Sequence, residues 1–284
     1  YYILLLLLLI FTLALSFSFT SNNFTTQDGI EESTAAPTTT SGSWTSSSSR
    51  YNTNFDSGNG DANDGEDGAG AYEISTPQQL AGMAYLVNTE SRYRGSDYIL
   101  TADIDLSAYY WTPIGNSSAP FTGSFNGNGH TISGLYINSS SSYQGLFGYV
   151  SGYSSSSPAE ISNIRVASGD LRVGISSAAI VGYGSNIRIL SVKNYVDVTL
   201  ISSTTGGAAA GILGYATNFF IIQNCKNAGD ISISSTNGMY LGGIVGRVPS
   251  TNSADYCFIR ECSNSGNITG TTGSGGIVGI NEAS

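Results

Sequence analysis

Five similar segments, each with a short apolar run beside glycine, recur at a nearly constant interval and constrain the fold more than any other feature. They are "QGLFGYV" at 144–150, "AAIVGYG" at 178–184, "AAGILGYA" at 209–216, "LGGIVGRV" at 241–248 and "SGGIVGI" at 274–280. Their last glycines are Gly148, Gly182, Gly214, Gly246 and Gly279, which are separated by 34, 32, 32 and 33 residues. A steady period of this size indicates a stacked repeat architecture.

A second repeated segment indicates that the repeat is built from strands. It follows the first four glycines as "ISNIRVASGDL" from 161, "ILSVKNYVDVTL" from 189, "IQNCKNAGDISI" from 222 and "IRECSNSGNITG" from 259. In the third copy, Cys225, Asn227, Gly229, Ile231 and Ile233 occupy every second position. Residues two apart share a face of a strand, and β-branched residues favour strands over helices.

Units this short cannot bury a core alone, so we predict an all-β fold in which the chain winds into a parallel β-helix. Each strand would pair with its copy in the next coil, about 4.8 Å away. Equivalent residues would then form columns, and Asn194, Asn227 and Asn264 would form an asparagine ladder at a bend. The repeat glycines are expected at corners, where they allow positive φ or a close approach between coils.

One helix is predicted ahead of the repeats, at 77–88. Thr76 is a suitable N-cap, Pro77 suits the first helical position and Gln79 completes a capping box. The helix would present one apolar face, made of Leu80, Met83, Ala84 and Val87. A β-helix has an open end with unpaired strand edges, and an amphipathic helix with a polar back would cap it.

Two further patterns lie between this helix and the repeats. The alternation in "YILTADIDLS" at 98–107 predicts a strand with Ile99, Ile104 and Leu106 in the core. The segment 121–137 reads as a strand, a tight Asn-Gly turn and a second strand.

The front of the chain differs in composition from the rest. Residues 1–19 are almost entirely apolar, which predicts a signal peptide or a membrane anchor. Residues 20–71 are rich in Ser, Thr, Asp, Asn and Gly, and we interpret them as a disordered linker. We therefore expect a β-helix domain over 72–284, with a cap at 72–110 and repeats at 111–284 that are truncated at the C-terminus.

The distribution of charge argues against a nucleic-acid partner. Residues 1–110 hold 13 acidic and 3 basic residues, whereas residues 111–284 hold 7 of each. No basic patch stands out that would neutralise phosphates. A membrane contact is expected only through the N-terminal apolar segment.

The cysteines and the single histidine give no sign of a metal or cofactor. Cys225, Cys257 and Cys262 are an odd number without a C-x-x-C pair, so neither a disulfide framework nor a zinc site is predicted. Cys225 and Cys262 share a register, which leaves a disulfide between them open. His130 is assigned to a turn, because no nucleophile or second acid is tied to it.

Charged residues also recur in register. Arg165, Lys193 and Lys226 would form one outward column, and Asp170, Asp197 and Asp230 would form another. Either the two columns belong to an enzyme that cleaves acidic polysaccharides, or they are ordinary solvated columns; we favour the second. Asp103 and Asp105 are either paired acids or cation ligands, or they form turn hydrogen bonds, and again we favour the second.

The segments described above resemble the GLUG-motif repeat proteins. The resemblance covers roughly 72–284 and departs at Ala178 and Ala179, where the motif has glycines. It implies a right-handed β-helix, display at the cell surface and adhesion, and it implies no catalytic site.

We therefore expect a non-enzymatic secreted or cell-surface protein that contacts glycans or proteins of a host or neighbouring cell. The contacts would use the outer faces and loops, including Tyr149, Tyr153, Tyr183, Tyr215 and Tyr256. The alternatives are a polysaccharide-degrading β-helix enzyme and a structural spacer.

Overall fold

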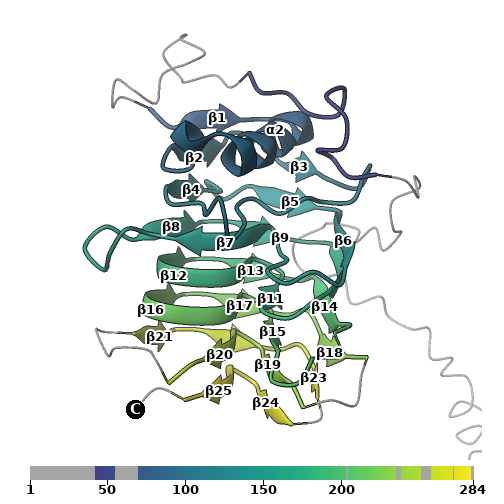
Figure 1. Ribbon diagram of the computed structural model, residues 1–284, viewed down its shortest axis with the longest axis vertical. Coiled ribbons are helices and arrows are strands. Elements are labelled where there is room, and N and C mark those ends of the chain that lie inside the picture. Colours follow the sequence, from purple (N-terminus) through teal and green to yellow (C-terminus); the bar gives the residue numbers. More distant parts are fainter. Residues whose placement is uncertain are drawn as a thin grey trace, which may run out of the picture. The chain divides into compact units, whose positions relative to one another are not determined.

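Parallel strands from successive turns of the chain form four sheets, as the computed structural model of the protein shows (Figure 1). Every pairing between its named strands is parallel, and the strands of one coil recur in the next at a fixed register. The fold is a right-handed parallel β-helix, as the repeat period predicted.

The structure describes residues 42–54, 70–202, 204–234, 238–250, 257–270 and 272–282, all within one unit that spans 33–284. The apolar segment predicted at 1–19 lies outside the described residues. Within the described ranges, no helix combines the length and the apolar character that crossing a bilayer requires.

Sheet 1 is the broadest of the four sheets. Its strands are β1 (Tyr72–Ile74), β2 (Asp97–Leu100), β4 (Ser124–Asn126), β7 (Phe147–Ser151), β8 (Ala159–Ser162), β12 (Val181–Leu190), β16 (Leu213–Gln223), β20 (Val245–Val248), β21 (Phe258–Arg260) and β25 (Val278–Asn281). β7 and β8 both pair with β12, so the loop that joins them replaces the middle of one long strand.

The other three sheets complete each coil. Sheet 2 contains β3 (Ile104–Asp105), β5 (Thr131–Ser133), β9 (Arg165–Val166), β13 (Lys193–Asn194), β17 (Lys226–Asn227) and β22 (Ser263–Asn264). Sheet 3 contains β6 (Leu135–Ser139), β10 (Gly169–Val173), β14 (Asp197–Leu200), β18 (Ile231–Ile233) and β23 (Ile268–Thr269). Sheet 4 contains β11 (Ser177–Ala178), β15 (Ala208–Ala210), β19 (Tyr240–Gly242) and β24 (Gly273–Gly275).

Columns of apolar side chains fill the interior between the sheets. Ile161, Ile189 and Ile222 lie above one another in β8, β12 and β16, and each is fully buried. Burying one such side chain stabilises the fold by about 1.5–3 kcal/mol. The alternation in the repeated segments therefore places one apolar residue per coil at each interior position.

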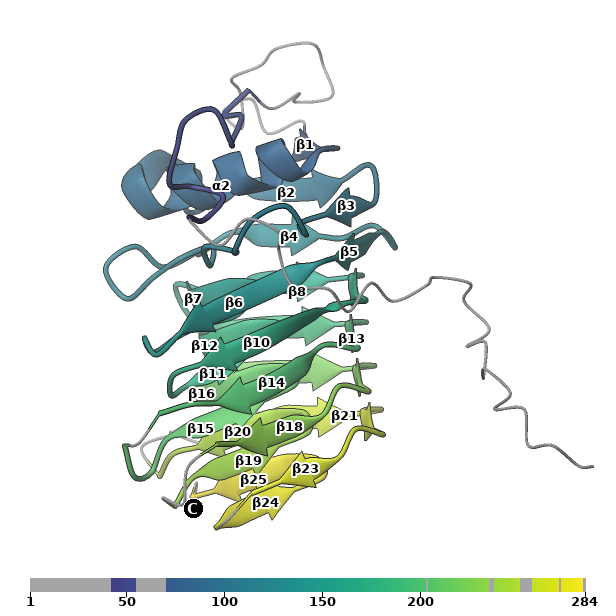
Figure 2. The same ribbon diagram turned by 90° about the vertical axis from the view of Figure 1, so that its right-hand side faces the viewer.

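The helix α2 (Pro77–Thr89) lies at the N-terminal end of the stack, between β1 and β2 in the chain (Figures 1 and 2). The backbone N–H of Gln79 donates to the Thr76 hydroxyl at 3.2 Å, as the N-cap prediction requires. The four residues of the predicted apolar face are all fully buried. A short 3-10 helix, η1 (Ser91–Tyr93), follows it.

Residues 42–54 pack against α2 and against residues 106–112 of the first coil, so the prediction that 20–71 is a disordered linker was wrong for this segment (Figure 2). Trp44 is buried, and its Nε1 donates to the Leu106 carbonyl at 3.0 Å. Tyr51 stacks on Tyr85 of α2 with the ring centroids 4.5 Å apart. These two aromatic residues supply the apolar area that the surrounding Ser and Thr residues lack.

The cap prediction assumed that the side of α2 facing away from the first coil is a polar surface open to solvent. That side is instead covered by the 42–54 segment. The N–H of Asn52 donates to the Gln78 carbonyl at 2.8 Å. Gly82 faces the Asn52 carbonyl so closely that a β-carbon at position 82 would overlap it. The helix is therefore enclosed between the first coil and the 42–54 segment.

Two local predictions can be compared with the structure. Ile104 and Leu106 are buried as predicted, but Ile99 is only partly buried, because Tyr98 and Leu100 face the core in β2. The 121–137 segment contains the predicted strand, Asn-Gly turn and second strand, and these two strands, β4 and β5, belong to different sheets. Asn128 and Gly129, with φ of 53° and 83°, turn the corner between those sheets.

Candidate functional site

Three basic residues form a vertical column on the outer face of sheet 2. Arg165, Lys193 and Lys226 begin β9, β13 and β17, and each pairs with the next in register. Their neighbours in the sequence, Val166, Asn194 and Asn227, point into the interior and are fully buried. We call Arg165, Lys193 and Lys226 the basic column. Strand alternation thus places all three side chains outside, on consecutive coils.

Tyr195 contacts two members of the basic column. The Arg165 guanidinium carbon lies 4.2 Å from the Tyr195 ring centroid, and the Lys226 Nζ lies 5.6 Å from it. These are distances at which the ring attracts a cation. Tyr195 was not singled out from the sequence. Its position two residues after Lys193, on the same outward side of the chain, is the signal that could have identified it.

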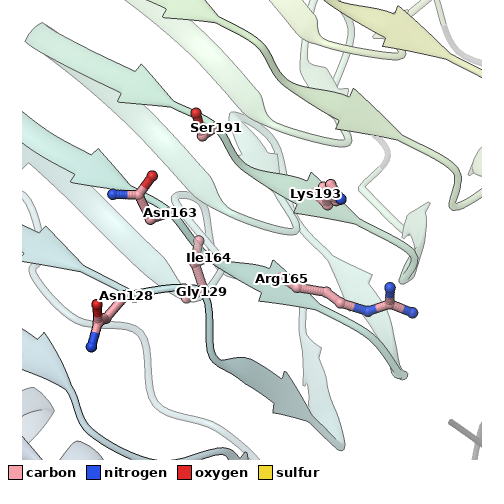
Figure 3. Close-up of a pocket in the computed structure, with 7 residues that line it drawn as sticks. All are labelled: Asn128, Gly129, Asn163, Ile164, Arg165, Ser191 and Lys193. Atoms are coloured by element: carbon pink, nitrogen blue, oxygen red, sulfur yellow. The ribbon is translucent and has the colours of Figure 1, made fainter. Parts of the chain in front are cut away.

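A groove of about 440 Å³ adjoins the basic column at the corner between sheets 1 and 2. Its lining residues are Asn128, Gly129, Asn163, Ile164, Arg165, Ser191 and Lys193 (Figure 3). Amide and hydroxyl side chains thus lie next to two positive charges.

The corner that lines the groove is built from residues with left-handed backbone. Asn128, Asn163 and Ser191 have φ of 53°, 54° and 57°. The Asn163 amide donates to the Asn126 side chain at 3.1 Å, and the Asn224 amide donates to the Ser191 hydroxyl at 3.1 Å. These contacts between coils hold the groove wall in place.

We call Asp170, Asp197 and Asp230, at sheet 3, the acidic column. Two of its carboxylates form hydrogen bonds with the backbone of neighbouring coils. A carboxylate oxygen of Asp197 accepts the N–H of Asp230 at 2.7 Å, and one of Asp230 accepts the N–H of Asn267 at 2.7 Å. Desolvation, and then the neighbouring Asp197 charge, raise the pKa of Asp170 above its usual value. Asp197 and Asp230 therefore connect neighbouring coils through their carboxylates.

Asp103 and His130 form a pair at an exposed turn. The Asp103 carboxylate accepts the Thr131 N–H at 2.9 Å and lies 3.1 Å from His130 Nδ1. The backbone hydrogen bond, and then the contact with His130, lower the pKa of Asp103. Asp105 accepts the Ser107 N–H at 2.9 Å. The Asp105 contact is the turn hydrogen bond that we favoured, whereas Asp103 bonds to the next coil and not within a turn. No group of three or more possible metal ligands occurs among the described residues.

The predicted ladder residues Asn194, Asn227 and Asn264 lie one above another in β13, β17 and β22. The Asn194 amide donates to Asn227 Oδ1 at 2.7 Å, and the Asn227 amide donates to Asn264 Oδ1 at 2.7 Å. Each amide also donates to a carbonyl two residues further along its own coil, at 2.8–2.9 Å. The bonds shape the bend between sheets 2 and 3.

The five repeat glycines lie inside strands of sheet 1 and not at corners, and none has a left-handed φ. Each is packed against the backbone of the coil before it. A β-carbon at Gly214 would lie 2.7 Å from the Gly182 carbonyl oxygen and 2.6 Å from the Ser177 nitrogen and oxygen of sheet 4. Close approach between coils, one of the two predicted reasons, and not positive φ, accounts for glycine at these positions.

The tyrosines that follow the repeat glycines stack on one another. The ring centroids of Tyr149 and Tyr183 are 4.1 Å apart, and those of Tyr183 and Tyr215 are 5.6 Å apart. The Arg247 guanidinium lies over the Tyr215 ring at the end of the stack. Because stacked rings cover each other's faces, they offer mainly edges to a ligand. Tyr153 is 77% exposed, and Tyr256 lies outside the described residues.

Cys225 and Cys262 are not joined by a disulfide in this structure. Cys225 is buried at the register of Ile164 and Val192, where the sequence placed a core residue, and Cys262 is partly buried one coil later. A hydrogen bond from the Cys225 thiol lowers the pKa of Cys262, and both that bond and burial raise the pKa of Cys225.

Comparison with known proteins finds a partial sequence match to one protein and a distant structural likeness to another. No family model matches it. It is 40% identical over 83 residues to a protein of Evansella cellulosilytica that is provisionally named a Gly-rich membrane protein. The match covers 26% of this chain and 10% of the relative, so the chain spans about a tenth of that relative's length.

A solved structure with some likeness comes from Bacteroides ovatus and is provisionally described as an immunoglobulin A1 protease. It is 15% identical, with a TM-score of 0.43, and the alignment covers 76% of this chain and 85% of that one. This similarity is too low to carry an inference about function.

Proposed function

We propose that the chain is a non-enzymatic secreted or cell-surface protein whose β-helix presents binding surfaces to host or neighbouring cells. The observation that carries the proposal is the basic column. It places three charges at regular intervals on the outside of a stack whose coils are held together by other residues. A surface of this kind is suited to contact with an extended partner.

The front of the sequence supports a location outside the cytoplasm. The apolar segment 1–19 is the type of segment that directs a chain into or across a membrane. The Evansella cellulosilytica relative, which carries the name of a membrane protein, is consistent with that location. The resemblance to GLUG-motif proteins belongs to the same proposal.

A polysaccharide-degrading enzyme is the alternative, and the contacts favour it less. Such an enzyme needs an acid and a base positioned together at the scissile bond. Here Asp197 and Asp230 accept backbone N–H groups of the next coil, and Asp103 is engaged by Thr131 and His130. We therefore propose binding without catalysis.

Binding of the labelled full-length chain to cells, extracellular matrix and immobilised glycans tests the proposal. We expect saturable retention on at least one of these surfaces, and its loss after the same chain has been heat-denatured. Absence of retention on all of them would contradict a display function. Release of reducing ends or unsaturated products from uronic-acid polymers would instead establish the enzymatic alternative.

A further inference from the structure

We propose that the basic column binds a linear carboxylated polysaccharide, one strand of which lies along the coil axis over Arg165, Lys193 and Lys226. The inference rests on the proposed function and names the ligand class for that surface. It follows from the spacing of the charges, from the role of Tyr195 and from the charges that surround the column.

Placing three positive charges in register on neighbouring coils is electrostatically unfavourable. Paired strands are about 4.8 Å apart, so each coil adds a positive charge directly above the previous one. Like charges directly opposite each other on neighbouring strands are destabilising. The interior positions beside them carry the packing and the asparagine ladder. Interior residues thus supply the packing and the ladder of these coils.

The acidic column shows what a structural column of like charges looks like in this molecule. Its carboxylates accept backbone N–H groups of the following coil at 2.7 Å, and these bonds offset the repulsion. Lysine and arginine side chains carry donors only, so they cannot accept backbone N–H groups in this way. The basic column therefore differs from the acidic column in its chemistry, and its N–H donors and positive charges are suited to an external anion.

Tyr195 holds two of the cations in position. Its ring attracts the guanidinium of Arg165 from the preceding coil and the ammonium of Lys226 from the following coil. Lys193 lies on the same strand as Tyr195 and is exposed. Fixing charged side chains before the ligand arrives reduces the entropy lost on binding. Tyr195 is therefore a positioning residue of the site.

The groove beside the column fits a sugar better than an isolated ion. It offers about 440 Å³ next to Arg165 and Lys193 and is lined by the amides of Asn128 and Asn163 and by Ser191 (Figure 3). Amides and hydroxyls donate and accept hydrogen bonds with sugar hydroxyls. A carboxylate on each cation would leave the attached ring close to these groups.

The surrounding charges limit how large the anion can be. In the column's register Thr131 comes before Arg165 and Ser263 comes after Lys226, so the positive charge ends after three coils. On the coil of Lys193 and Tyr195, Asp197 lies two residues after Tyr195, and its side chain is exposed. Over residues 111–284 the 7 acidic and 7 basic residues balance, so no wider positive surface surrounds the column. A duplex nucleic acid, which needs many cations over a wide surface, is disfavoured relative to one narrow chain.

Binding of polygalacturonate to the full-length chain, measured by calorimetry or immobilised-ligand assay, tests the inference. The test variant is Arg165→Gln with Lys193→Gln and Lys226→Gln. The control variant is Arg172→Gln with Arg188→Gln, which removes two cations from sheets 3 and 1. Three exposed ion pairs correspond to roughly a tenfold change in affinity, and the control should change it about twofold or less.

Two variants of Tyr195 test whether its ring positions the cations. Tyr195→Phe retains the ring and should bind as the unmodified chain does, whereas Tyr195→Leu should weaken binding by a few-fold. Equal weakening by both variants, with folding unchanged by circular dichroism, would contradict the positioning role.

The following outcomes would overturn the ligand class, the site or both proposals. Equal binding to fully methyl-esterified polygalacturonate, or equal binding to duplex DNA of matched length, would overturn the ligand class. Unchanged affinity in the triple variant would overturn the site. If polygalacturonate fails to bind while cells still retain the chain, the ligand class is wrong but the display function stands. If neither is bound, both proposals fail.

Discussion

At the scale of single residues, space and hydrogen bonding decide which side chains the repeat requires. The repeat glycines are needed because a neighbouring backbone occupies the place of a β-carbon. The ladder asparagines are needed because each amide satisfies its own bend and the adjacent coil. Both requirements recur once per coil, which explains why the same residue types return at the same interval.

Replacing Gly214 by alanine should destabilise the fold by about 3 kcal/mol or more, because the new methyl group would meet backbone atoms that cannot move aside. Gly276→Ala is the matched control, since a β-carbon there meets nothing within 4 Å and the φ is not left-handed. Chemical denaturation of the two variants measures the difference. Similar losses of stability in both would show that close packing is not the reason for Gly214.

The Asp103 carboxylate should contribute to stability in a pH-dependent way. Its pKa is lower in the folded chain than its ordinary value of 3.8, because it accepts the Thr131 N–H and contacts His130. A carboxyl with a lowered folded pKa stabilises the fold above its unfolded pKa and loses that effect as the pH falls through its folded pKa. Between pH 6 and pH 2, the stability advantage of the unmodified chain over Asp103→Asn should therefore shrink. An advantage independent of pH would contradict this assignment.

At the scale of elements, the N-terminal end of the β-helix is a layered structure and not a single capping helix. The first coil, α2 and the 42–54 segment lie on one another, joined by Trp44, by the Tyr51–Tyr85 stack and by Asn52. A polar segment can pack in this way when a few large aromatic residues supply most of the buried area. The end of the sheet stack is thereby covered twice.

Trp44→Ala should lower the free energy of unfolding by about 3–5 kcal/mol, since it removes a buried indole and its hydrogen bond to Leu106. Ser48→Ala, an exposed position in the same segment, should have almost no effect. Denaturant midpoints of the full-length variants provide the comparison. A small effect of Trp44→Ala would indicate that the 42–54 segment is not part of the folded unit.

At the scale of the whole β-helix, stability is the sum of contacts between neighbouring coils. Coils in the middle of the stack have a partner on both sides, and their interior side chains, such as Ile189 and Ile222, are fully buried. In β21 and β23, interior residues such as Ile259 and Ile268 are only partly buried. Repeat architectures of this type open coil by coil from their least protected part.

Amide hydrogen exchange should therefore be slowest in β12 to β17 and fastest, among the strands, in β21 to β25. Mass spectrometry of the exchanged full-length chain gives the profile at the level of peptides. A uniform rate across all coils would instead mean that the β-helix unfolds as one cooperative unit.

The sequence by itself determined the repeat, the strand content, the parallel β-helix, the capped helix and the residues that stack in columns. Each of these follows from local periodicity, because the same residue must satisfy the same surroundings in every coil. Local periodicity also predicted that Arg165, Lys193 and Lys226 would lie in one column.

Only the tertiary structure decided which backbone passes close to each residue. It showed that Gly214 faces sheet 4, that Asn128 and Gly129 turn a corner between two sheets, and that Tyr195 lies against Arg165 and Lys226. It also placed Trp44 against the first coil, more than 60 residues away in the chain. The Trp44 contact lies outside the repeats, so no local pattern records it, and the others depend on which atoms of neighbouring coils and sheets meet in space.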